Sequence, residues 1–114
     1  MKNFALFLRA NYDMSPESFA DPKEIELRAA WLEDVKQKNI VVHLGGAMPP
    51  IPTMATTIFS NGDEKSGAFT EEKHFLTGYL IITAKDLDDA KTIASSNPIL
   101  KAGGSVEIRE IILR

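Results

Sequence analysis

Three side chains capable of acid–base chemistry lie close together in the middle of the chain. Glu71, Lys73 and His74 follow a turn-forming Asn61-Gly62 pair and precede a very apolar segment. A histidine can exchange a proton near neutral pH, and a neighbouring carboxylate can orient its ring. The lysine could hold an anionic group of a substrate. The pattern favours a proton-transfer site, and the alternative interpretation is a hydrated connector whose charges face water.

Four further residues could complete such a site. His43 lies in an apolar segment and could be a second proton-transfer group across a cleft from His74, or an ordinary half-buried histidine. Arg9 could bind a carboxylate through two parallel hydrogen bonds, or pair with a surface acid. Phe69 could form a wall of the pocket and Tyr79 could contact the substrate, although packing alone explains both rings as well.

Composition argues against several classes of function. The 114 residues include 13 basic and 16 acidic ones, for a formal net charge of −3, without a basic stripe that would bind nucleic acid. Cysteine is absent, which removes disulfides and thiolate chemistry. Two widely spaced histidines are a weak signal for a metal site, and no cofactor is expected. No apolar run approaches the ~20 residues of a membrane helix. No leader segment opens the chain, so a cytoplasmic location is expected.

Short apolar runs and turn signals predict the strands of one domain over residues 1–114. The first run is nearly continuous, which is typical of a central strand, and Arg9 should end it. The second is β-branched, and Gly45-Gly46 should halt it. The strands are expected at residues 4–8, 40–44, 56–59, 65–69, 78–83 and 105–113. The third and fourth of these should form a hairpin around Asn61-Gly62.

Two amphipathic helices are expected between these strands. Asp21 and Pro22 should begin the first, which runs to about Lys38, and Asn39 suits the left-handed position after it. Asp86 should cap the second. The residues expected on the apolar faces are Ile25, Ala29, Leu32 and Val35, with Trp31 beside them, in the first helix and Leu87, Ala90, Ile93 and Ala94 in the second.

This order of strands and helices predicts an antiparallel sheet with both helices on one face, which is a ferredoxin-like α+β fold. The other face of the sheet would be bare, and the predicted elements include no further helix to cover it. We therefore expect a homodimer that packs sheet against sheet or seals a sheet edge.

Several segments resemble the YCII-related proteins, in the branch named after an Asp-Gly-Pro-Phe motif. The similar stretches are Ser66–Phe69, Glu71–Lys73, Gly78-Tyr79, Asp86–Ala90 and Gly104–Arg109, together with Trp31 and Gly45-Gly46. The motif itself departs from the branch, since Ser66 replaces its aspartate and Ala68 its proline. The resemblance implies a dimeric α+β barrel with a cleft for a small molecule. It also implies an enzyme using a His–Asp pair in some relatives and a regulatory partner, such as a sigma factor, in others.

Two hypotheses for function follow. The chain could be an enzyme that performs elimination or isomerisation on a small organic acid without a cofactor, with a histidine moving the proton and Lys73 or Arg9 holding the carboxylate. It could instead be a non-catalytic dimer that binds a ligand or a partner. The altered positions Ser66 and Ala68 would then mark lost chemistry.

Overall fold

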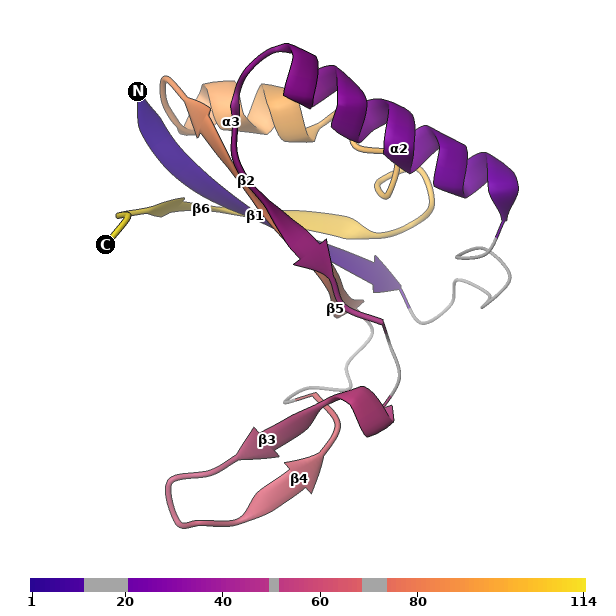
Figure 1. The fold of residues 1–114 in the computed structure, drawn as a ribbon, viewed down its shortest axis with the longest axis vertical. Coiled ribbons are helices and arrows are strands. Elements are labelled where there is room, and N and C mark those ends of the chain that lie inside the picture. The colour runs from indigo at the N-terminus through magenta and orange to yellow at the C-terminus, as the bar shows by residue number, and fades with distance from the viewer. Residues whose placement is uncertain (12–20, 50–51, 69–73) are drawn as a thin grey trace.

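The computed structural model describes residues 1–11, 21–49, 52–68 and 74–114, and for His74 the backbone alone (Figure 1). Strands and helices follow one another in the predicted order. They are β1 (Lys2–Asn11), α2 (Pro22–Gln37), β2 (Val41–Ala47), a short 3₁₀ turn (Pro52–Met54), β3 (Thr56–Ile58), β4 (Glu64–Ser66), β5 (His74–Ala84), α3 (Leu87–Ala94) and β6 (Ser105–Ile111). No helix in these ranges is long and apolar enough to cross a membrane.

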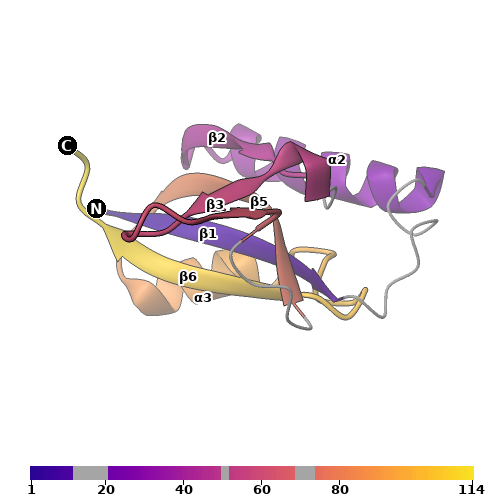
Figure 2. The same cartoon turned by 90° about the horizontal axis from the view of Figure 1, so that it is seen from below.

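Four of the strands form one sheet in the order β2-β5-β1-β6, and every neighbouring pair is antiparallel. β1 is central, as its continuous apolar run predicted. Figures 1 and 2 show α2 and α3 on the same face of this sheet. The predicted ferredoxin-like α+β fold is therefore confirmed.

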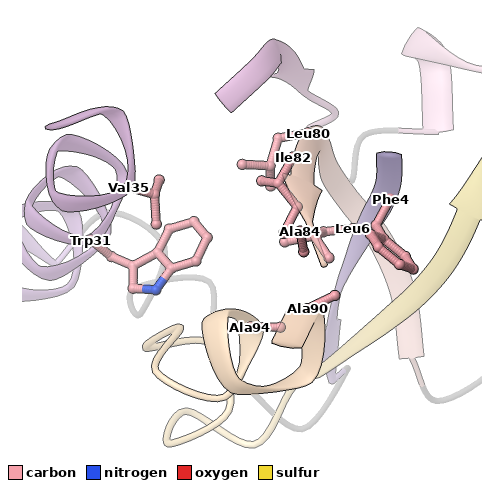
Figure 3. Close-up of a cluster of buried hydrophobic side chains, with 9 residues drawn as sticks. All are labelled: Phe4, Leu6, Trp31, Val35, Leu80, Ile82, Ala84, Ala90 and Ala94. Atoms are coloured by element: carbon pink, nitrogen blue, oxygen red, sulfur yellow. The ribbon is translucent and has the colours of Figure 1, made fainter. Parts of the chain in front are cut away.

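The core lies between this sheet face and the two helices (Figure 3). Phe4 and Leu6 alternate along β1, and their partners across the ladder are Ile82 and Leu80 of β5. All four side chains are buried. Each such side chain contributes about 1.5–3 kcal/mol by leaving water, so this layer fixes the register of the two central strands.

Helix α2 begins and ends where its capping residues predicted. The Asp21 side chain accepts a hydrogen bond from the Lys23 N–H at 3.0 Å, and Asn39 adopts a left-handed φ of 58°. Helix α3 begins at Asp86, whose side chain accepts from the Asp89 N–H at 2.8 Å. These ends depend on one or two residues each, which is why local sequence specifies them.

The predicted apolar faces of the helices are partly wrong. In α2, Trp31 and Val35 are buried, whereas Ile25 is half exposed and Ala29 exposed. The helix turns its tryptophan toward the end of α3, where the indole N–H donates to the Ser96 hydroxyl at 2.9 Å. In α3, the small side chains Ala90 and Ala94 face the core and Leu87 is largely exposed.

Two strands continue past the residues expected to end them. β1 runs through Arg9, which pairs with Leu76 on one side and Ser105 on the other. β2 runs through Gly45-Gly46 to Ala47 because irregularities in its ladder with β5 absorb the extra residues. At Gly45 φ is 66°, and a Cβ there would lie 1.8 Å from the Tyr79 carbonyl oxygen. The glycine thus permits the close approach instead of halting the strand.

The predicted hairpin around Asn61-Gly62 is confirmed, although it is shorter than expected. Strands β3 and β4 form a separate two-stranded sheet that projects from the four-stranded one (Figure 1). At the tip, the Asn61 side chain accepts from the Asp63 N–H at 2.9 Å. Met54, Ile58 and Phe59 expose apolar surface on this arm, with Ile58 70% exposed.

Candidate functional site

The sheet face opposite the helices, called the open face from here on, carries the candidate residues that the structure describes. In β1, the residues on this face alternate with the core residues. The register of the ladders identifies their neighbours on the same face of β5 and β6. From one end of the sheet to the other, the rows are Asn3 with Thr83 and Ile111, Ala5 with Ile81 and Arg109, Phe7 with Tyr79 and Glu107, and Arg9 with Leu76 and Ser105.

Arg9 and Glu107 form a short ion pair on the open face. The Arg9 Nη1 donates to Glu107 Oε1 at 2.6 Å, joining β1 to β6 diagonally across two rows. The two side chains are 30% and 46% exposed. A pair this exposed contributes roughly 0–1 kcal/mol to stability. Arg9 was expected either to bind a carboxylate of a substrate or to pair with a surface acid. In the described residues it pairs with an acid, Glu107.

Two aromatic residues lie beside this ion pair. Phe7 is the Cα partner of both Tyr79 and Glu107, so the two rings and the acid come from one row across three strands. Tyr79 is 37% exposed and Phe7 is half-buried. Cβ atoms of directly paired antiparallel residues lie about 4.5–5.5 Å apart. The row therefore places Phe7 next to the Glu107 carboxylate, and Tyr79 lies one strand further away on the other side of Phe7.

The backbone of His74 reaches the same end of the sheet. His74 pairs with Asn11, two residues beyond Arg9 along β1, and begins β5. The structure thus brings His74 and Arg9 onto neighbouring strands near the Arg9–Glu107 ion pair. Phe69, Glu71 and Lys73, the other candidates around His74, lie outside the described residues.

His43 lies at a different part of the sheet. Its partner is Ile81 of β5, seven residues from His74, which is about 23 Å along the strand at roughly 3.3 Å per residue. The ring is exposed, and its Nδ1 accepts the Gly45 N–H at 2.9 Å. An accepting Nδ1 leaves the proton of the neutral ring on Nε2. Within one chain, the two histidines are not brought together.

Residues of the types that bind metal ions do not form a metal centre in the described part of the chain. Across residues 1–11, 21–49, 52–68 and 74–114, no group of three or more histidine, aspartate or glutamate side chains could hold a metal ion. In the rows given above, the open face carries two cations, Arg9 and Arg109, together with the Glu107 carboxylate and two aromatic rings.

Sequence reasoning did not include Glu107 or Phe7 among the site residues. A usable signal existed, because the alternation of residues 105–111 predicted Glu107 and Arg109 on one face of the last strand. What was missing was the register. Only the pairing of Phe7 with Glu107 shows that this face is the one that carries Arg9.

Comparison with known proteins agrees with the fold. The structure of 5-chloro-2-hydroxyhydroquinone dehydrochlorinase from Burkholderia phenoliruptrix AC1100, in complex with 2,5-dihydroxybenzoquinone, is similar at a TM-score of 0.52. The two are 20% identical, over 96% of this chain and 93% of that one, and this likeness concerns the fold alone. No curated protein matches the chain. The family model for the YCII-related domain matches residues 5–113, and the chain therefore belongs to the YCII-related family.

Proposed function

We propose that this chain is a cofactor-independent acid–base catalyst that eliminates or isomerises a small organic acid. The observation that carries the proposal is the Arg9–Glu107 ion pair on the open face, at the end of the sheet where His74 begins β5. Membership of the YCII-related family supports it. The dehydrochlorinase activity named for the similar structure, a loss of hydrogen chloride, suggests the class of reaction.

The roles in this proposal follow the chemistry of each side chain. His74 moves the proton, and Glu71 orients its ring. Arg9 and Lys73 hold the polar end of the substrate, while Phe69 and Tyr79 contact its carbon frame. His43 is the second proton-transfer group. It would come from a second copy of the chain, because the register of β2 and β5 holds it away from His74 within one copy.

The proposal includes a homodimer in which two open faces pack together. Tyr79 is partly exposed there, and the edge strand β2 exposes Val42 and Leu44 as well. Light scattering coupled to size exclusion should therefore give twice the 12.6 kDa mass of the chain at micromolar concentration. A species of single-chain mass across that range would contradict the dimer and remove His43 from the proposed site.

Replacing His74 by alanine should abolish most of the catalysis. Positioned proton transfer contributes about 10²–10⁴-fold to rates, so His74→Ala should lower kcat by at least about 100-fold. The first substrate to test is 5-chloro-2-hydroxyhydroquinone, the one named for the similar structure, with chloride release as the measurement. In the reaction one hydroxyl proton moves to the ring carbon that bears chlorine, and a second hydroxyl proton is then removed as chloride leaves with the bonding electron pair, for a net loss of hydrogen chloride.

The control for this experiment is Lys36→Ala, an exposed position in α2 on the helix side of the sheet. It should retain the wild-type rate, and both variants should unfold at the wild-type temperature. An unchanged rate in His74→Ala would remove the histidine from the mechanism. A wild-type chain that releases no chloride above the buffer rate would exclude this substrate and favour the non-catalytic alternative.

The alternative is a non-catalytic dimer that binds a ligand or a regulatory partner. The observation that favours it is the apolar surface of the β3–β4 arm, at Met54, Ile58 and Phe59. The arm also ends at the altered signature, where Ser66 pairs with Thr56. This alternative predicts that Ile58→Asp weakens partner binding while the fold is retained.

A further inference from the structure

We infer that Arg109 binds the carboxylate of a small monocarboxylic acid on the open face, with the hydrocarbon part of the acid lying over Ala5 and Ile81. The inference rests on the proposed function, because it names the residue that holds the acid end of the same substrate. It assigns this task to Arg109 in place of Arg9, which is already bound to Glu107.

The first step concerns the charge of the open face. Its rows hold two cations, Arg9 and Arg109, and one carboxylate, Glu107. One positive charge on this face is therefore uncompensated, although the whole chain carries a net charge of −3. A positive surface raises the local concentration of anions and speeds their association. The open face thus favours a ligand with a single negative charge.

The second step identifies the cation that is free to bind this ligand. Arg9 donates to Glu107 at 2.6 Å, so an incoming acid would have to displace Glu107 from it. Arg109 is exposed, and its side chain has no ion pair or hydrogen bond within the described part of the chain. A guanidinium offers donors in a planar fork that fits a carboxylate through two parallel bonds. A carboxylate can reach Arg109 without displacing another acid.

The third step concerns the surface beside Arg109. Arg109 pairs with Ala5 of β1, and Ala5 pairs with Ile81 of β5, so the three residues form one row. Ala5 has the smallest side chain in the four rows, yet it is only 6% exposed. Because α2 and α3 lie on the other face (Figures 1 and 2), larger neighbours on the open face must surround it. The guanidinium therefore adjoins a low apolar area, which suits a short hydrocarbon chain better than a second charged group.

The fourth step places this row relative to the two histidines. Ala5 lies six residues from Asn11, the partner of His74, which is about 20 Å along β1 at roughly 3.3 Å per residue. His43, however, ends the same row on β2. The proposed function combines His74 of one copy with His43 of a second copy. In that arrangement, Arg109 and His43 come from the same copy and the same row.

Nuclear magnetic resonance of the full isotope-labelled chain near neutral pH tests the inference with two probes. Butyrate is a short monocarboxylate, and butyramide has the same shape without the charge. Butyrate should shift the backbone amide signals of Ala5, Ile81 and Arg109. It should bind at least about 10-fold more tightly than butyramide, because hydrogen bonds between charged groups are the stronger ones. Arg109→Gln should lose at least about 10-fold in affinity for butyrate and keep its affinity for butyramide.

The matched control is Arg114→Gln, which removes the same charge at an exposed position after β6. This variant should bind butyrate as the wild-type chain does. Three outcomes would each overturn the inference. They are a wild-type chain in which butyrate shifts none of these amides, wild-type affinity for butyrate in Arg109→Gln, and an equal loss of affinity in Arg114→Gln.

This result is separable from the catalytic proposal, since binding is measured without turnover. Loss of butyrate binding in Arg109→Gln, together with an unchanged rate in His74→Ala, would keep the inference and reject the catalysis by His74. Wild-type butyrate binding in Arg109→Gln, together with a His74→Ala variant that no longer turns over, would keep the catalysis and reject the inference.

Discussion

Replacing Ile82 by alanine should destabilise the domain by about 2–5 kcal/mol, the range for truncating a buried aliphatic side chain. Ile82 lies in the central strand β5, is 0% exposed, and pairs with Phe4 under both helices. The loss combines the transfer of the removed carbon atoms with the cavity they leave. Because domains of this kind are stable by only about 5–15 kcal/mol, the unfolding midpoint in urea should fall clearly.

Ile112→Ala deletes the same atoms at a position that is 89% exposed, just after β6. Its effect should stay within about 0.5 kcal/mol. If Ile82→Ala does not fold, Ile82→Val should still lose about 0.5–1.5 kcal/mol. Equal effects at Ile82 and Ile112 would contradict the placement of the core between helices and sheet.

Gly45→Ala should destabilise the domain by an amount on the order of 2–4 kcal/mol. A residue other than glycine in the left-handed region costs about 1–3 kcal/mol, and each lost ladder bond about 1 kcal/mol more. At Gly45 both apply, since φ is 66° and the added Cβ would lie 1.8 Å from the Tyr79 carbonyl oxygen. The strand β2 would have to move away from β5. Thermal unfolding followed by circular dichroism measures the change.

The neighbouring Gly46→Ala provides the comparison. A Cβ at Gly46 would meet nothing within 4 Å. Alanine at a compatible glycine position stabilises by about 0.4–1 kcal/mol through the unfolded chain. Gly46→Ala should therefore be neutral or slightly stabilising. A loss at Gly46 as large as that at Gly45 would show that the irregular β2–β5 ladder differs from the one described.

Sequence predicted those parts of the fold that a few neighbouring residues determine. Asp21 and Asp86 cap their helices, Asn39 ends the first one, and Asn61-Gly62 forms the tip of the hairpin. The order of these elements, with right-handed connections, was then sufficient for the ferredoxin-like sheet. The apolar face of α2 was harder to predict, because the Trp31 indole donates a hydrogen bond to Ser96, which lies 65 residues away in the sequence.

The candidate site was predicted less completely, because its contacts also join residues that lie far apart in the sequence. Arg9 and Glu107 are 98 residues apart in sequence, and their contact depends on the registers of two ladders with β1 at the centre. The residue type of Arg9 suggested that it could bind a carboxylate or pair with a surface acid, but it did not indicate that Arg9 meets Glu107. The separation of His43 from His74 also depends on register, and no spacing in the sequence encodes it.

The separate sheet of β3 and β4 offers an experimental handle on how copies of the chain are arranged. Ser60 lies on its exposed tip, and exposed polar tips tolerate modification well. The chain contains no cysteine, so Ser60→Cys would provide a single thiol for attaching a fluorophore. Energy transfer between donor-labelled and acceptor-labelled chains would then report the separation between the two tips.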